Sequence, residues 1–168
     1  MRRLAYILTV LLLAGLSACG QPVVIHPHES EPADTKQFIT VFLAGTIDNG
    51  ESEDWQKTVE GKLTGRNRKY LLYNPRQEEW HPEKEGEMAY QVNWELDHME
   101  KADHILMVFL PGSRSPITLL EFGLYVRSGK LHVVCPPDFY RYDNVRLTCV
   151  HYGVPLFETI DEALETLP

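Results

Sequence analysis

Basic residues are scarce in this sequence. Its 16 lysines and arginines stand against 24 aspartates and glutamates, which gives a formal net charge of -8 at neutral pH. Proteins that bind nucleic acid without sequence preference neutralise backbone phosphates with a surplus of positive charge. This chain lacks such a surplus, so we expect no nucleic-acid partner. A small anionic ligand held in a local pocket is still compatible with the charge.

Signatures of several catalytic and cofactor-binding classes are also absent. The sequence contains no glycine-rich phosphate loop of the P-loop type and no Ser/His/Asp signature. The histidines of the chain's second half do not show the spacing of metal ligands; they are His98, His104, His132 and His151. The pattern therefore predicts neither a metal ion nor a redox cofactor.

The apolar segment near the N-terminus is too short to span a bilayer. Leu4 to Ala18 carry no charge, but these 15 residues fall short of the ~20 that a transmembrane helix needs. Arg2 and Arg3 precede the segment, and Leu16-Ser17-Ala18-Cys19 ends it. Together these features resemble the signal peptide and lipobox of bacterial lipoproteins. The resemblance predicts that residues 1–18 are removed and that Cys19 carries the lipid of a membrane anchor; a plain secretory signal is the alternative.

The residues after Cys19 are predicted to form a flexible tether over 19–36. Three prolines and several charges lie between residues 20 and 36, a composition typical of linkers. Gly20 follows the cysteine, so the aspartate that retains enteric lipoproteins in the inner membrane is missing. We therefore expect an extracytoplasmic location, at the outer membrane where the organism has one.

Two further cysteines, Cys135 and Cys149, lie in the second half of the chain. An extracytoplasmic compartment permits a disulfide, but sequence alone does not place two Cα atoms within bridging distance. We favour two buried thiols.

Short apolar runs alternate with amphipathic segments from residue 37 onward, which predicts one folded domain over 37–168. Strands are expected at 38–44, 70–73, 104–110, 131–134 and 155–157, helices at 53–63, 87–101, 116–128 and 159–167, and a loop at 135–144. Ser52 and Ser115 suit the N-cap positions of two helices. This alternation predicts an α/β fold whose parallel sheet is covered on both faces. Ligands of such folds bind outside the carboxyl ends of the strands.

One carboxylate stands out among the residues that could carry chemistry. Glu121 is the only charge in the apolar run that begins at Ile117, and on a helix it shares a stripe with Ile117, Leu124 and Tyr125. A carboxylate on an apolar stripe is unfavourable unless it is paired or used. The alternative is that Glu121 emerges at the helix edge and meets solvent or Arg127.

Several stretches together resemble a known family. They are FLAGTID at 42–48, YNPRQEEW at 73–80, and the long stretch from Gln91 to Tyr125. Their order and spacing resemble the nucleoside 2-deoxyribosyltransferase-like family over nearly all of residues 38–158. The resemblance implies a flavodoxin-like three-layer sandwich with a five-stranded parallel sheet. It also implies cleavage of the N-glycosidic bond of a nucleoside or nucleotide, with Glu121 as the nucleophile that forms a glycosyl-enzyme intermediate.

The resemblance further implies a set of substrate-binding residues. Gly45 and Asp48 match the family's loop after the first strand, and either Glu95 or Asp97 supplies an acidic group near the base, the spacing to Glu121 favouring Glu95. Asn144 matches an asparagine that a neighbouring subunit places on the sugar, which implies a homo-oligomer with shared sites. From the residues alone, Asn74 and Arg76 either orient substrate or end a strand. Of the tryptophans, Trp94 is the candidate for stacking on a base.

One loop departs from the pattern of the classical transferases, which carry an acidic residue just before the nucleophile's helix. Here the loop reads Ser113-Arg114-Ser115-Pro116. Nucleotide-hydrolysing relatives have a serine in this region, and Ser113 or Ser115 could bind a 5′-phosphate together with the N–H groups of the helix start. Arg114 either adds positive charge or is a solvated loop residue.

The sequence thus supports an enzyme that acts on nucleosides or their 5′-monophosphates, by transfer to a base or by hydrolysis. A membrane-tethered domain that binds nucleotides without turnover is the main alternative, and an NAD-cleaving glycohydrolase is a third.

Overall fold

The computed structural model describes residues 20–168 of the chain. The predicted signal peptide and Cys19 lie outside the described residues. Within them, no helix combines the length and the apolar character that crossing a membrane requires.

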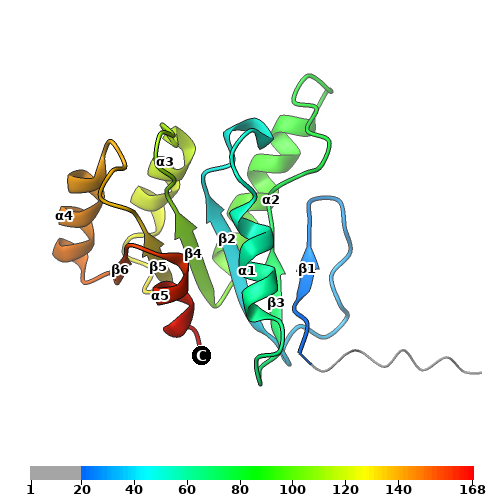
Figure 1. The fold of residues 1–168 in the computed structure, drawn as a ribbon. Coiled ribbons are helices and arrows are strands. Elements are labelled where there is room, and N and C mark those ends of the chain that lie inside the picture. The colour runs from blue at the N-terminus through cyan, green and yellow to red at the C-terminus, as the bar shows by residue number, and fades with distance from the viewer. Residues whose placement is uncertain (1–19) are drawn as a thin grey trace, which may run out of the picture.

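Figure 1 shows one twisted sheet between two layers of helices. The elements in chain order are β1 (Val23–Ile25), β2 (Ile39–Gly45), the 3₁₀ turn η1 (Asp48–Gly50), α1 (Trp55–Leu63), β3 (Tyr70–Tyr73), α2 (Glu87–Lys101), β4 (His104–Val108), α3 (Pro116–Tyr125), β5 (Leu131–Val134), α4 (Tyr142–Tyr152), β6 (Leu156–Phe157) and α5 (Ile160–Glu165). All strand pairs are parallel, in the order β1-β3-β2-β4-β5-β6. Helices α1 and α5 pack on one face, and α2, α3 and α4 pack on the other. The predicted flavodoxin-like α/β fold is confirmed.

Strand β2 shows how a continuous apolar run serves both layers. Val41 and Leu43 belong to the core cluster that contains Trp55 of α1, whereas Phe42 and Ala44 belong to the cluster on the opposite face. None of these four strand residues is more than 1% exposed. Side chains alternate across a strand, so a central parallel strand needs apolar residues at every position.

The predicted tether is wrong for the residues that form β1. Val23, Val24 and Ile25 pair in register with β3, at Leu71, Leu72 and Tyr73. The sheet therefore has six strands and not the expected five. β-branched side chains favour a pleated strand, and the free edge of β3 offers unpaired N–H and C=O groups. The prolines flank this short strand and do not interrupt it.

Helix α4 begins within the predicted loop at 135–144, and the sequence analysis assigned no helix between that loop and the strand at 155–157. It begins at Tyr142 and ends at Tyr152, with Gly153 in the left-handed conformation that commonly ends helices. Only Val145 and Cys149 of this helix are buried, so its apolar periodicity is weak. Cys149 and Cys135 are both buried and unbonded, which confirms the expectation of two buried thiols.

The first helix starts later than its predicted cap. Its N-cap is Asp54, whose carboxylate accepts the N–H of Lys57. The predicted N-cap, Ser52, instead donates its hydroxyl to the carbonyl of Ile47, at 3.0 Å. Ser52 thus closes the turn between β2 and α1, and this turn borders the candidate site.

Candidate active site

A cavity of about 380 Å³ opens at the carboxyl ends of β2 and β4. The chain passes from β2 outward to β3 and then returns to β4 on the other side, so this is the topological switch point of the sheet. The walls come from four segments: Gly45–Gly50 after β2; Pro75, Gln77 and Trp80 after β3; Met88, Gln91, Val92 and Glu95 of α2; and Ser115–Thr118 and Glu121 at α3. The fold thus brings the predicted ligand-binding loops together at one edge.

Gly45 lines the cavity and cannot carry a side chain. Its φ is +145°, and a Cβ atom there would lie 2.3 Å from the carbonyl oxygen of Val108. The close approach of β2 and β4 continues at Thr46, whose N–H donates to the same carbonyl at 2.9 Å. Glycine at this position therefore lets the loop after β2 turn directly over the end of β4.

Glu121 lines the cavity from α3 and is only 8% exposed. Its buried neighbours on the helix are Thr118, Phe122 and Tyr125. The predicted stripe is therefore correct for Tyr125 but wrong for Ile117 and Leu124, which are exposed. The alternative that Glu121 emerges at the helix edge to meet solvent or Arg127 is also wrong: Glu121 is buried, and Arg127 forms no ion pair with it and donates instead to the hydroxyl of Tyr152.

A second carboxylate, Glu95 of α2, lines the same cavity. Burial, and secondarily the charge of Glu95, raises the pKa of Glu121 to about 8. Burial also raises the pKa of Glu95, although the amide of Gln91 donates to it at 2.8 Å. No residue between 20 and 168 donates a hydrogen bond to the Glu121 carboxyl. Two buried carboxyl groups that share one cavity do not ionise together readily, so the pair retains a proton near neutral pH.

A chain of hydroxyl groups joins the loop after β2 to the start of α3; Thr46, Asp48 and Ser115 line the cavity, and Ser113 does not. Ser113 donates to the carboxylate of Asp48 at 3.0 Å, and it accepts from the N–H of Ser115 at 3.1 Å. The Ser113 and Ser115 hydroxyls lie 2.9 Å apart, and Ser115 lies 2.6 Å from the Thr46 hydroxyl. Because Ser113 gives its only proton to Asp48, Ser115 is the donor in its hydrogen bond with Ser113. The Thr46 hydroxyl has two acceptors within reach, the Ser115 hydroxyl and the carbonyl oxygen of Val108 at 3.4 Å.

Ser115 occupies the N-cap position of α3, as predicted, with Pro116 as the first helical residue. Its hydroxyl makes no capping hydrogen bond, and its backbone is left-handed with φ 43°. The left-handed conformation is unfavourable for a residue with a side chain. It turns the Ser115 hydroxyl into the hydroxyl chain and away from the helix start.

Asn74 and Arg76 support the site but do not line the cavity. The Asn74 side chain accepts the N–H of Arg76 at 3.0 Å. Arg76 donates to the side chain of Gln56 at 3.1 Å and to the carbonyl of Glu53 at 3.0 Å, and to the hydroxyl of Ser52 at 2.9 Å. Its guanidinium thus fixes the turn between β2 and α1, which forms one rim of the cavity.

The structure places the two remaining candidates outside the cavity. Asp97 is exposed on α2, two residues beyond Glu95, and Asn144 is exposed on α4. Trp94 belongs to the core, where it packs near Phe42 and Tyr73. Trp80 is the tryptophan at the cavity.

Sequence reasoning missed part of the cavity wall. Met88, Gln91 and Val92 precede Glu95 on α2 and line the cavity with it. Residues three and four apart share a helix face, so the position of Glu95 is the signal from which this face could have been predicted. No group of three or more His, Cys, Asp or Glu side chains in residues 20–168 could hold a metal ion.

Comparison with known proteins bears on the same segment. Residues 39–139 match the family described as nucleoside 2-deoxyribosyltransferase like. No curated protein sequence matches the chain significantly. The matched residues run from β2 to the start of the loop before α4 and include every residue that lines the cavity. The chain therefore belongs to the nucleoside 2-deoxyribosyltransferase-like family.

Proposed function

We propose that this protein is an enzyme that cleaves the N-glycosidic bond of a nucleoside or nucleoside 5′-monophosphate, with Glu121 as the nucleophile. The observation that carries the proposal is a buried carboxyl group that receives no hydrogen bond from residues 20–168 and lines a cavity that it shares with a second carboxyl group. A buried carboxylate stabilises positive charge on a sugar more strongly than one in water. Family membership independently favours chemistry at this bond.

The first step has the ionised Glu121 attack the anomeric carbon. A bond forms between its carboxylate oxygen and that carbon, while the bond from the carbon to the base nitrogen breaks. The bonding electron pair leaves with the base, which takes a proton from the neutral Glu95 carboxyl. The products are a sugar ester of Glu121, a neutral free base and an ionised Glu95. The single proton shared by the two groups must therefore reside on Glu95 when the step begins.

The second step releases the sugar. Glu95 takes a proton from water, whose oxygen then bonds to the anomeric carbon as the ester bond to Glu121 breaks. If a second base enters before water, its nitrogen forms this bond and the proton it loses goes to Glu95. The same two side chains thus serve hydrolysis and transfer, and the acceptor decides the outcome.

The remaining walls suit the two parts of a nucleoside. Trp80, Met88 and Val92 offer aromatic and apolar surface for a base. Asp48 and the Ser115 hydroxyl offer polar partners for the sugar and its 5′ group, and Ser113 hydrogen-bonds to both of them.

The test measures release of free base by the full-length protein from deoxynucleosides, ribonucleosides, their 5′-monophosphates and NAD. We expect Glu121→Gln to lower turnover by roughly a thousandfold, whereas Glu78→Gln, an exposed glutamate, leaves it unchanged. Activity that depends on an added base identifies transfer, and activity without one identifies hydrolysis. Equal activity of the Glu121→Gln protein contradicts the proposal.

Binding without turnover is the second candidate. The observation that favours it is the raised pKa of Glu121, because a carboxyl group that keeps its proton is a poor nucleophile. Under this candidate no substrate yields free base, yet nucleotides still bind, which equilibrium dialysis with the same compounds detects.

We also propose that Cys19 is lipidated and anchors the protein to a membrane. The support is in the sequence: Arg2 and Arg3, the uncharged segment 4–18, and Leu16-Ser17-Ala18 before the cysteine. Mass spectrometry of the mature N-terminus tests this, with Cys19→Ser as the control that loses both lipid and membrane association.

A further inference from the structure

The N-terminal segment after Cys19 is docked along the domain. The carbonyl of Gly20 accepts the N–H of Gly65 at 2.6 Å, and β1 then pairs with β3. Because this pairing is parallel, the start of β1 lies at the same end of the sheet as the start of β3. This is the end opposite the cavity, which opens at the carboxyl ends of the strands. In Figure 1 the chain enters the described residues at the lower end, and the loop after β2 is at the upper end.

Side-chain contacts hold the rest of the segment in place. His26 bonds to the carbonyl of Arg76 at 2.9 Å, and the ring of His28 stacks on Tyr90 with centroids 4.0 Å apart. As the segment returns toward β2, Glu31 forms an ion pair with Lys101 and a second contact, at 3.2 Å, with His98. The segment between Gly20 and β2 is thus held by contacts at Gly20, at His26 and His28, and at Glu31.

A docked segment removes the reach of a tether. Fully extended, 17 free residues would span up to about 56 Å, which would let the domain adopt any orientation above a membrane. With Gly20 held against Gly65, whatever is attached to Cys19 is one peptide bond away from the folded domain. The seven residues of β2 separate the two ends of the sheet by roughly 23 Å.

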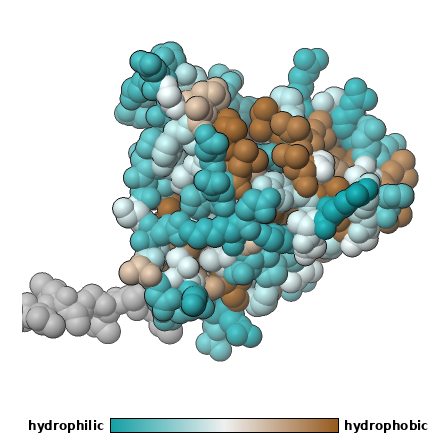
Figure 2. All heavy atoms as spheres, turned by 180° about the vertical axis from the view of Figure 1, so that it is seen from behind, coloured by the Kyte–Doolittle hydropathy of each residue, from teal (hydrophilic) through white to brown (hydrophobic). Residues whose placement is uncertain are grey.

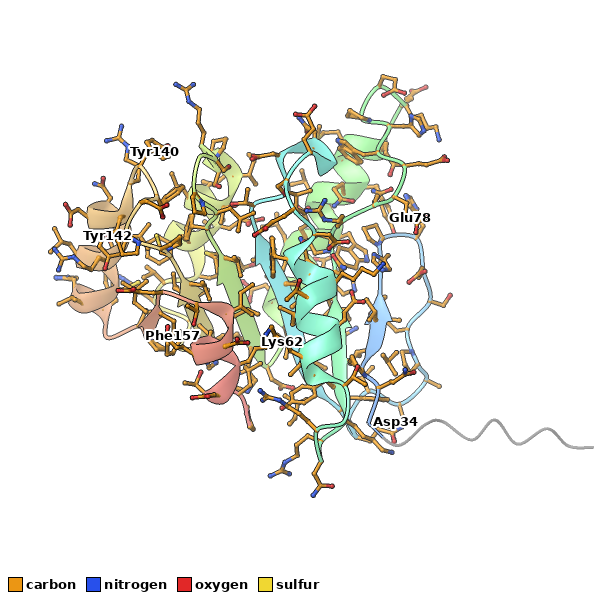
Figure 3. All side chains as sticks on the ribbon, viewed as in Figure 1. Asp34, Lys62, Glu78, Tyr140, Tyr142 and Phe157 are labelled. Carbon is orange, nitrogen blue, oxygen red and sulfur yellow. The ribbon has the colours of Figure 1, made fainter. Side chains whose placement is uncertain are left out.

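The surface around Gly20 carries exposed positive charge in a protein of net charge -8. Arg68 and Lys69, with the partly buried Arg66, lie in the loop that begins at Gly65. None of the three forms an ion pair with a carboxylate in the described part of the chain. Two opposite charges also lie near this end: Asp34, labelled in Figure 3, on the segment before β2, and the C-terminal carboxylate of Pro168, a residue that accepts a hydrogen bond from the hydroxyl of Tyr70. Lysine and arginine beside a lipid anchor are attracted to anionic headgroups.

We infer that the protein sits directly on the lipid surface, with the 65–69 loop against anionic headgroups and the cavity facing away from the membrane. This rests on the proposed lipidation of Cys19. The distance between the two ends of the sheet, roughly 23 Å, exceeds the ~8–10 Å over which surface charge acts in physiological salt. The cavity therefore draws its substrate from the aqueous phase, and the headgroups do not reach it.

The test places a fluorophore on the full-length lipidated protein in vesicles that contain quencher-labelled headgroups. One reporter is Asn67→Cys in the basic loop, and the matched reporter is Glu78→Cys, labelled near the opposite end in Figure 3. We expect strong quenching at position 67 and background quenching at position 78. A Gly/Ser linker of about twelve residues between Cys19 and Gly20, with a mean reach of about 20 Å, should abolish the difference.

The charge contribution is tested with vesicles of phosphatidylcholine alone and of phosphatidylcholine with phosphatidylglycerol. Quenching at position 67 should increase with phosphatidylglycerol, and Arg68→Gln with Lys69→Gln should remove this increase. The control pair is Arg114→Gln with Arg141→Gln at the cavity end, which should retain this increase.

Equal quenching at positions 67 and 78 in a lipidated protein overturns the inferred orientation alone. A mature protein without lipid on Cys19 overturns both the anchor and the orientation. Neither readout depends on enzyme activity, so loss of the proposed reaction remains a separate result.

Discussion

At the scale of single residues, Glu121 is placed where ionisation is unfavourable. Its helix neighbours are apolar or uncharged, and its nearest titratable partner in the cavity is another carboxyl group. A structural role would require a partner for the carboxyl group, and the described residues provide none. A substrate with a developing positive charge at the anomeric carbon would provide one.

Glutamine at position 121 should reveal the strain that this carboxyl group imposes. In the folded protein the pKa of Glu121 is raised from 4.5 to about 8, so the folded state holds this proton more tightly than the unfolded state. The contribution of Glu121 to stability is therefore fully present below pH 4.5 and is lost as pH rises through 8. We expect the stability advantage of Glu121→Gln over wild type to grow by on the order of 3 kcal/mol between about pH 5 and pH 8.

Urea unfolding at a series of pH values measures this difference, and Glu78→Gln is the exposed control. A difference between Glu121→Gln and wild type that stays constant over this range would mean that the group titrates normally.

Asp48 should control how well a 5′-phosphate is accepted. It receives the proton of Ser113, the serine whose position suggested a phosphate site, and its negative charge repels a phosphate bound there. Asp48→Asn removes this charge and keeps an oxygen that can accept from Ser113. We expect the ratio of kcat/KM for a nucleoside 5′-monophosphate to kcat/KM for the nucleoside to rise about tenfold.

Steady-state kinetics with one base and both forms of its sugar gives this ratio directly. Because general damage to the site lowers both values together, only the ratio tests the electrostatic argument. An unchanged ratio would place the 5′ group away from Asp48.

At the scale of elements, β1 is the part of the fold whose contribution is easiest to isolate. Ile25 is 5% exposed and belongs to the core cluster beside α2. Its truncation to alanine should lower the free energy of unfolding by roughly 2–4 kcal/mol. Val150→Ala on α4, where the side chain is 71% exposed, should change it by less than about 0.5 kcal/mol. Denaturant unfolding measures the free energy of unfolding of both variants. If Ile25→Ala lowers it as little as Val150→Ala does, residues 20–36 form a free tether.

The elements that the sequence predicted correctly are those whose burial leaves a clear pattern. The strand ranges 70–73 and 131–134 agree with β3 and β5, and the range 87–101 agrees with α2. Strand β1 was missed because three residues between prolines carry little signal, and its pairing depends on an edge that only the folded sheet offers. Helix α4 was missed because several of its apolar side chains face solvent.

The site was predicted in part for the same physical reason. A single carboxylate in an apolar run singled out Glu121, because burial of charge is unusual in any context, and the structure places this residue, buried, in the lining of the cavity. Apolar character alone could not show which neighbours share its face, because Ile117 and Leu124 are apolar and exposed. The support that Arg76 gives to the turn after β2 depends on contacts between segments far apart in the sequence.

At the scale of the whole molecule, one face carries most of the exposed large apolar side chains of the described residues. Figure 2 shows apolar side chains gathered over part of the face formed by α2, α3 and α4. The exposed apolar residues of these helices are Met88, Tyr90, Val92, Leu96, Ile117, Leu120, Leu124, Leu147, Val150 and Tyr152. Large exposed apolar patches commonly mark interaction sites. Met88, Val92 and Ile117 also line the cavity, so a molecule bound to this face would border the site.

We expect this molecule to be a second copy of the chain. Asn144 is exposed on α4 and does not line its own cavity, so it can contact a ligand only from a neighbouring subunit. Replacing Leu120 and Leu124 with lysine should convert the assembly to monomers, because each subunit would bury two positive charges without partners at the interface. We expect the monomeric variant to release less base. Because neither leucine lines the cavity, such a decrease would be due to the loss of assembly. Thr58→Lys on α1, at the opposite face, is the matched control and should retain both properties. Analytical ultracentrifugation measures the assembly, and a wild-type chain that sediments as a monomer over a wide concentration range would leave each cavity to work alone.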